Sequence, residues 1–274
     1  MTHFKASVLN NFRLGVSSKR FDDICRQIDW AIGLGASTIR INDSVGGLQP
    51  HLTHELCGEL VQRYPTITFC LHAHNDNGLA VANTMAAIQS GFQMIEGSLA
   101  GFGNRSGIAP IEQVVKLCQN NNITLGAQAI DLAKLVECAR QSERTFGAIP
   151  NLYRPVSGIF ETDSNFGVLN IPDFLETNDE KRYFVNYAGL HPVTLKMALS
   201  RHAQSIDVKD LTDDVLWDVV RKLQNEIESS DETVTQDYNK MLGTIDEFYG
   251  RHVITTKSIA DRVVSLLGKE TAIA

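Results

Sequence analysis

Short apolar runs alternate with segments of helical periodicity along the first part of the chain. In the first helical segment, Phe21, Ile24 and Ile28 recur every three or four positions, which is the spacing of one helix face. The runs between such segments are rich in β-branched and aromatic residues, as strands are. The pattern predicts strands at residues 6–9, 38–42, 66–71 and 93–98, each followed by a helix, at residues 18–34, 53–63, 78–90 and 110–119. This alternation predicts βα units and a parallel sheet.

The rhythm changes beyond Ile123. Residues 147–170 contain Pro, Gly and Asn and are expected to form an irregular connection. From His191 the pattern is helical again, and residues 211–214 (Leu-Thr-Asp-Asp) predict a helix start. The residues that follow are spaced for a buried stripe, made of Val215, Val219, Leu223 and Ile227. We therefore expect three parts, residues 1–127, a linker region at 128–190 and a helical subdomain at 191–274.

The composition describes an ordinary globular protein, with 43% hydrophobic and 21% charged residues among 274. A net charge of -7 argues against a nucleic-acid partner, because a phosphate-binding surface needs clustered Lys and Arg. The chain has no basic stretch followed by an apolar core at its start and no apolar run of about 18 residues, so we expect no membrane partner and a cytoplasmic location. The cysteines form no CxxC pair and are expected to be buried free thiols in a reducing compartment; they are Cys25, Cys57, Cys70, Cys118 and Cys138.

Two histidines stand at the end of the third predicted strand, His72 and His74. Residues two apart on a strand project to the same face, so the two imidazoles could reach one metal ion. The carboxyl end of a barrel strand is also where active-site groups of a TIM barrel gather. The bare His-x-His pattern is weak, however, and more often belongs to exposed histidines or to histidines whose hydrogen bonds are satisfied in a core.

The residues around the histidines resemble a known superfamily. HAHNDNGLAVAN starts at His72, GSLAGFGNRSG starts at Gly97 and NDSVG starts at Asn42. Together they resemble the HxHNDxGLAxAN, GxGERxGN and PDTVG motifs of the isopropylmalate synthase, homocitrate synthase and hydroxymethylglutaryl-CoA lyase superfamily. AGLHPVTLKMALSRH and LTDDVLWDVVRKLQ are similar to the helical subdomain of the synthases. The resemblance, to the C-terminal half of these enzymes, implies an α/β fold: half a TIM barrel of four βα units, followed by a mostly helical C-terminal subdomain.

The resemblance also implies a chemistry. His72 and His74 would bind a divalent metal, which could be magnesium, manganese or zinc. The metal would polarise the keto group of a 2-oxo acid for attack by the enolate of an acyl-CoA. Asp43 and Ser44 would line the substrate end of the preceding strand, although NDSVG without this context reads as a strand-ending turn.

Other polar residues of the motifs are open to simpler interpretations. Glu96 and Arg105 would be polar contacts for substrate in the barrel mouth, although an ion pair between them explains both equally well. Asn83 receives no catalytic role, because an Asn on a helix is as often solvated or bonded to nearby backbone.

The chain departs from the superfamily pattern in several places. Asn104 stands where the motif has Glu, and Ile108 stands where it has a metal-coordinating Asn. The Arg-Asp pair of the first barrel strand has no counterpart, because the chain begins near the fifth strand of the pattern. The linker at residues 160–167 lacks the histidine of the FxHESGIH motif, so no catalytic residue is assigned. His191 and His202 are interpreted as surface or helix histidines.

Three functions are compatible with these residues. The first is a subunit of a split condensing enzyme that acts on a 2-oxo acid and an acyl-CoA and binds its metal with a protein partner. That partner would supply the missing N-terminal half-barrel or be a second copy of the chain, because an open half-barrel exposes sheet edges and an apolar face. The second is a non-catalytic scaffold or regulatory homologue. The third is an aldolase of the hydroxymethylglutaryl-CoA lyase or 4-hydroxy-2-oxovalerate type.

Overall fold

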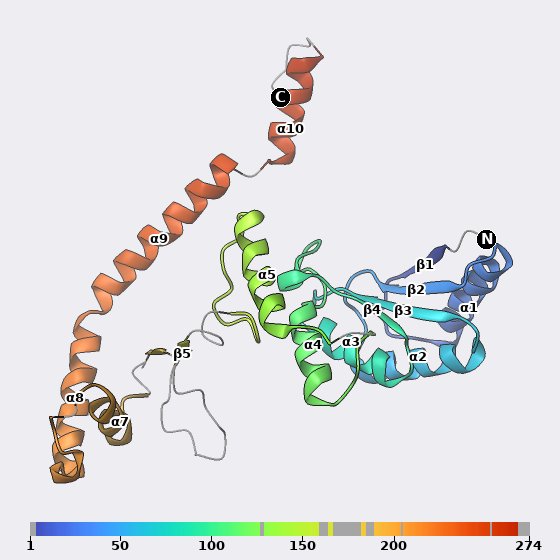
Figure 1. Ribbon diagram of the computed structural model, residues 1–274. Helices are drawn as coiled ribbons and strands as arrows, with labels where there is room; N and C mark the ends of the chain where they lie inside the picture. Colours follow the sequence, from blue (N-terminus) through green and yellow to red (C-terminus); the bar gives the residue numbers. More distant parts are fainter. Residues whose placement is uncertain are drawn as a thin grey trace. The chain divides into compact units, whose positions relative to one another are not determined.

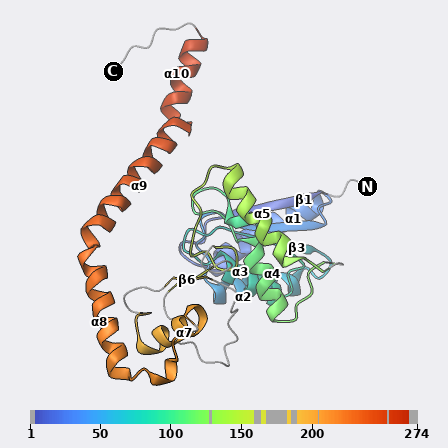
Figure 2. The same cartoon turned by 60° about the vertical axis from the view of Figure 1, so that its left-hand side comes forward.

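The computed structural model describes residues 4–126, 129–158, 164–166, 182–184, 189–203, 205–252 and 254–267 (Figures 1 and 2). The chain divides into two compact units, residues 1–165 and 166–274, and each is described by itself. The predicted boundaries at residues 127 and 190 remain a prediction. Among the described helices, none is long and apolar enough to cross a membrane.

The first unit is built on a four-stranded parallel sheet in the order β1-β2-β3-β4. The strands are β1 (Lys5–Asn10), β2 (Thr38–Asp43), β3 (Thr68–Ala73) and β4 (Met94–Glu96). The helices that follow them in turn are α1 (Ser18–Gly33), α2 (Pro50–Arg63), α3 (Ala80–Gln89) and α4 (Ile111–Asn120). The short 3-10 helix η1 (Leu99–Gly101) interrupts the loop between β4 and α4. The four predicted βα units and the half-barrel fold are therefore confirmed.

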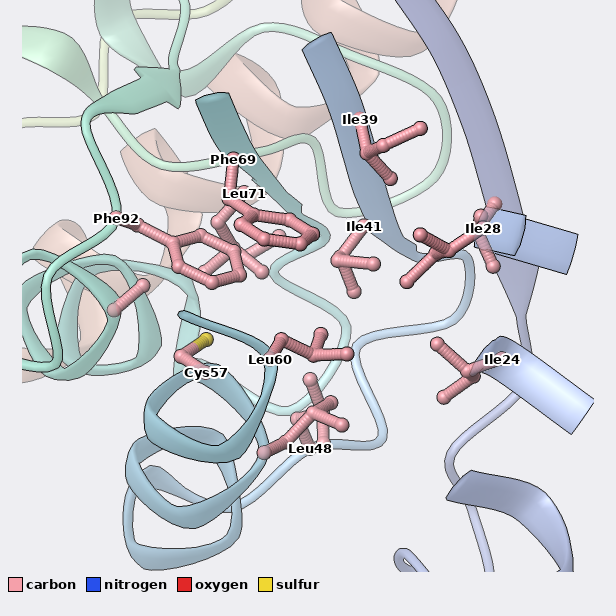
Figure 3. Packing of buried hydrophobic residues seen from close by; sticks show 14 of the residues in the cluster. Ile24, Ile28, Ile39, Ile41, Leu48, Cys57, Leu60, Phe69, Leu71 and Phe92 are labelled. Carbon is pink, nitrogen blue, oxygen red and sulfur yellow. The ribbon is translucent and has the colours of Figure 1, made fainter. Parts of the chain in front are cut away.

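The core of this unit lies between the sheet and its helices (Figure 3). Alternate side chains of β2 and β3, such as Ile41 and Leu71, are fully buried against the helix layer. Phe69 stacks on Phe92 with ring centroids 5.2 Å apart, and Leu60 of α2 is fully buried in the same cluster. Because side chains alternate along a strand, this packing turns the other set of side chains away from the helices.

We call that second set the inner face, because it corresponds to the interior of a closed barrel. It is made of Lys5, Ser7 and Leu9 on β1, Thr38, Arg40 and Asn42 on β2, Thr68, Cys70 and His72 on β3, and Met94 and Glu96 on β4. Leu9 is 62% exposed there. In the part of the chain that the structure describes, β1 and β4 each pair with one neighbour only, so both are sheet edges.

A helix that the hydrophobic pattern did not predict completes the first unit. This helix, α5 (Leu132–Thr145), is capped by Asp131, whose carboxylate accepts a hydrogen bond from Lys134 N at 3.1 Å. It carries Cys138, which is exposed, so the prediction that all cysteines are buried is wrong for this residue. The other four cysteines are buried and free, as predicted.

The second unit is mostly helical, as predicted. It contains α7 (Pro192–His202), η4 (Val208–Asp210), α8 (Asp213–Ser229), α9 (Asp231–His252) and α10 (Thr256–Leu266). Strand β5 (Ser164–Phe166), which lies at the boundary between the two units, and β6 (Arg182–Phe184) form a separate two-stranded sheet. Of the irregular connection expected at residues 147–170, residues 147–158 have neither helix nor strand, whereas residues 164–166 form β5, which the pattern did not predict.

The predicted buried stripe of α8 is wrong by one residue. Leu216 and Val220 are buried, whereas Val215 is 50% exposed. Two apolar series run side by side on this helix at a spacing of four, a longer one from Val215 to Ile227 and a shorter one made of Leu216 and Val220. The helix buries the series of Leu216 and Val220. The predicted spacing of four residues was therefore right, but the wrong one of the two adjacent series was predicted to be buried.

Candidate functional site

His72 and His74 lie together at the carboxyl end of β3. Their ring centroids are 5.1 Å apart and the ring planes meet at 69°. The side chains are 18% and 11% exposed, so both imidazoles are largely buried but still accessible. The structure therefore brings together the two residues that the His-x-His pattern singled out, on the same side of the sheet.

Glu96 lies beside His72 because the two residues are register partners on β3 and β4. His72 Nδ1 is 2.8 Å from Glu96 Oε2, and Arg40 Nη1 donates to the same oxygen at 3.1 Å. Lys5 Nζ donates to the other oxygen, Oε1. Burial alone would raise the pKa of Glu96, but the hydrogen bonds from Lys5 and His72 and the charge of Arg40 bring this pKa down to about 2. Glu96 is therefore an ionised carboxylate shared by three donors.

The predicted alternative of an ion pair between Glu96 and Arg105 is wrong. Arg105 instead binds Asp76, with Nε 2.7 Å from Oδ1 and Nη2 3.0 Å from Oδ2. Arg105 Nη2 also donates to the backbone oxygen of Ser44 at 2.7 Å. The hydrogen bond from Arg105 lowers the pKa of Asp76. Arg105 thus ties the loop after β4 to the ends of β2 and β3, and its proposed contact with substrate remains a prediction.

Asp43 and Ser44 occupy the turn after β2. The buried carboxylate of Asp43 accepts hydrogen bonds from Gly47 N at 2.8 Å and Leu48 N at 2.9 Å. Burial is the main cause that raises the pKa of Asp43. A Cβ on Gly47 would lie 2.6 Å from Arg13 N, so glycine is required in this turn. Both oxygens of Asp43 support the turn, as the simpler interpretation of NDSVG expected, and the substrate-binding role of Asp43 and Ser44 remains a prediction.

Two buried polar atoms beside the histidine pair have no hydrogen-bond partner. They are Nδ1 of His74 and Oδ1 of Asn42. Asn42 was not among the predicted site residues. Side chains alternate along β2, and this alternation places Asn42 on the inner face, where it is the register partner of His72. Burial is the main cause that lowers the pKa of His74, which favours the neutral imidazole that metals bind. Buried polar atoms are normally paired, so these two indicate a place for a further group.

The residues present fit a divalent metal in part. Two imidazoles on one face, with unpaired polar atoms beside them, suit a metal ion. In the part of the chain that the structure describes, however, no group of three or more His, Cys, Asp or Glu residues could hold one. Ile108, which replaces the Asn of the motif, pairs with His74 through an isolated β-bridge and offers no ligand atom. The remaining ligands of a metal would have to come from outside this set.

The other polar residues considered from the sequence have structural partners. Asn83 is fully buried, donates a hydrogen bond to Leu48 O at 3.0 Å and accepts one from Thr53 Oγ1 at 3.0 Å. It therefore connects α3 to α2 and to the turn after β2. His191 caps α7 by accepting from Val193 N at 3.2 Å. His202 lies at the end of α7 and is exposed. Of the linker at 160–167, residues 160–163 and 167 lie outside the described residues.

Comparison with known proteins identifies the first unit. The family model described as HMGL-like matches residues 15–141, which include the histidine pair and the glycine-rich loop. Residues 15–141 belong to the HMGL-like family. This HMGL-like domain confirms the resemblance that the HAHNDNGLAVAN motif carries.

The curated relatives of this chain include enzymes named homocitrate synthase. Over 172 residues it is 39% identical to a homocitrate synthase of Sulfolobus acidocaldarius, covering 58% of this chain and 36% of the relative. Over 204 residues it is 34% identical to a homocitrate synthase of Sulfurisphaera tokodaii, covering 70% and 42%. A crystal structure of the Bacillus subtilis HMG-CoA lyase matches with a TM-score of 0.49 and 23% identity, covering 58% of this chain and 54% of that one. The chain therefore spans less than half the length of these two homocitrate synthases.

Proposed function

We propose that this chain supplies the histidine-bearing half of a metal-dependent enzyme that condenses an acyl-CoA with a 2-oxo acid. The observation that carries the proposal is the placement of His72 and His74 on one face at the carboxyl end of β3, with unpaired polar atoms beside them. The similarity to enzymes named homocitrate synthase and 2-isopropylmalate synthase supports this reaction class.

Each of the described site residues would have a separate role. His72 and His74 would hold the metal through their imidazoles, and a bound divalent metal would polarise the keto oxygen of the 2-oxo acid. Asp43 would keep the turn after β2 in shape, and Arg105 would hold the glycine-rich loop against it. Through these contacts the chain would form one wall of the substrate site, with Ser44 and Arg105 nearest to it.

The half that completes the barrel would be a different chain rather than a second copy. The charged residues of the inner face are Lys5, Arg40 and Glu96, so the face carries one more cation than carboxylate. A second copy would bring the same excess into a shared interior, and the metal would add to it. A buried charge is stable only when it is paired, which favours a partner with inward-facing carboxylates. Those carboxylates could also be the missing metal ligands.

The test is the release of free coenzyme A by the assembly purified from its own cells, supplied with acetyl-CoA, a divalent metal and a series of 2-oxo acids. We expect release with at least one 2-oxo acid, and at least a hundredfold loss in His72→Ala and His74→Ala. The matched control is His51→Ala, because His51 is exposed on α2, away from the inner face. Absence of release with every acid, or release of pyruvate from a hydroxy-oxo acid instead, would refute the condensing reaction.

A scaffold or regulatory role is the second candidate, and Ile108 in the ligand position favours it. A scaffold would bind its partner through the same half-barrel but would not need the imidazoles. In the same assay, His72→Ala and His74→Ala would then leave the activity of the partner unchanged. The two candidates therefore make opposite predictions for the same pair of variants.

A further inference from the structure

We propose that Glu96 is a positioning residue for His72: it accepts a hydrogen bond from Nδ1–H and so leaves Nε2 as the atom that binds the metal. This inference rests on the proposed function for the identity of the bound group. It differs from the predicted role of Glu96 as a contact for substrate, which remains a prediction; hydrogen bonds with three side chains engage both of its carboxylate oxygens.

The geometry between the two residues fixes which atom carries the hydrogen. His72 Nδ1 and Glu96 Oε2 are 2.8 Å apart, which is a hydrogen-bond distance. An ionised carboxylate can only accept hydrogen bonds, so the hydrogen must sit on Nδ1. In a neutral imidazole only one nitrogen is protonated, and the lone pair of Nε2 is then available to a metal.

The sheet holds Glu96 in place for this role. Lys5 on β1 and Arg40 on β2 both reach across the inner face to the carboxylate of Glu96 on β4. Arg40 is itself held by Ser7, because Arg40 Nε donates to Ser7 Oγ at 3.0 Å. Side chains from the three other strands of the sheet therefore take part in orienting the imidazole on β3, and strands position a site more rigidly than loops do.

His74 has no equivalent partner, so the two histidines are not alike. Its Nδ1 is unpaired, and the nearest carboxylate oxygen, on Asp76, is 4.0 Å away and engaged by Arg105. We therefore expect His72 to hold the Nδ1–H tautomer before any metal binds. The imidazole of His74 has no carboxylate partner of this kind; its hydrogen bond is with the backbone of Gly107.

The test measures the tautomer of His72 directly, in the full-length chain without metal, partner or substrate. Long-range ¹H–¹⁵N spectra of histidine-labelled protein at about pH 8.5, where an ordinary imidazole is neutral, distinguish a protonated from an unprotonated ring nitrogen. We expect His72 to be protonated at Nδ1 in the native chain, with its signal assigned by its loss in His72→Gln. In Glu96→Gln, where a carboxamide can donate as well as accept, we expect at least half of the population to move to Nε2–H. Glu59→Gln, on the exposed side of α2, should change nothing.

A His72 that is protonated at Nε2 in the native chain would overturn the proposal, and this result does not depend on how the variant folds. A tautomer that is unchanged in a folded Glu96→Gln would overturn it as well. The consequence for metal is a loss of about 10- to 100-fold in Zn²⁺ affinity for Glu96→Gln in the purified assembly, which is usual for such hydrogen-bond partners. Because the tautomer is read without substrate, the proposal can hold even if no condensation is found, and it can fail even if condensation occurs.

Discussion

Arg154 is the centre of a buried ionic cluster whose removal should be costly. Its guanidinium donates from Nη1 to Glu143 Oε1 at 2.6 Å and from Nε to Ser157 Oγ at 2.6 Å. Glu112 lies on its other side, with Oε1 3.6 Å from Arg154 Nε. All three charged side chains are at most 8% exposed. The cluster ties the segment around residue 154 to α4 and α5.

We expect Arg154→Met to lower the free energy of unfolding by about 3 kcal/mol. Breaking a buried ion pair by removing one partner typically costs about 3–5 kcal/mol, because the other charge stays buried and unpaired. We expect a cost at the lower end of this range, because the carboxylates of Glu112 and Glu143 keep some of their hydrogen bonds. Ser157 Oγ and Ala100 N still donate to Glu112, at 2.8 and 3.2 Å, and Asn151 N still donates to Glu143 at 3.3 Å.

The measurement is urea unfolding followed by circular dichroism at neutral pH. Adding Glu143→Met to Arg154→Met should recover about 1 kcal/mol or more, since it removes one of the two unpaired charges. Arg221→Met is the control, because its pair with Asp218 is exposed and should be worth no more than about 0.5 kcal/mol. A loss below about 1 kcal/mol for Arg154→Met, or no recovery in the double variant, would refute this account of the cluster.

Three further predictions concern single residues. A thiol reagent should label one cysteine of the native protein, Cys138, and Cys138→Ser should abolish the labelling; rapid labelling of a second thiol would contradict the buried positions of the other four. Gly107→Ala should destabilise the loop after β4, because its Cβ would lie 1.8 Å from Gly101 O, whereas Gly58→Ala in α2 meets nothing within 4 Å and should stabilise by about 0.5–1 kcal/mol; thermal unfolding that ranks the two the other way would contradict this. Phe69→Ala should cost about 3–5 kcal/mol in urea unfolding, and a loss below about 2 kcal/mol would mean that this core is loosely packed.

The βα units could be predicted from the sequence because their signals are local. Buried strands appear in the sequence as short apolar runs, and the observed strand ends differ from the predicted ends by at most two residues. Helix α5 was missed, although Asp131 offered a capping signal and Leu132, Leu135, Val136 and Ala139 recur at helical spacing. On α8 two apolar series compete, and only packing against α7 decides between Val215 and Leu216.

The contacts of the site depend on register, which the sequence does not give. His72 and His74 are two residues apart, and this spacing was enough to place both imidazoles on the same face of the sheet. The ion pair with Arg105, one of the two interpretations left open for Glu96, was wrong, because pairing of β3 with β4 brings Glu96 to His72. Asn42 could have been found from the alternation of side chains along β2, but no motif marked it.

We propose above that this chain is one half of a metal-binding barrel that a carboxylate-bearing partner completes. The most direct test is the native mass and metal content of the assembly purified from its own cells. We predict a stoichiometric complex with a chain that carries βα units with inward-facing Asp or Glu, holding about one metal ion per pair of chains. A metal-free assembly made only of copies of this chain would contradict the claim.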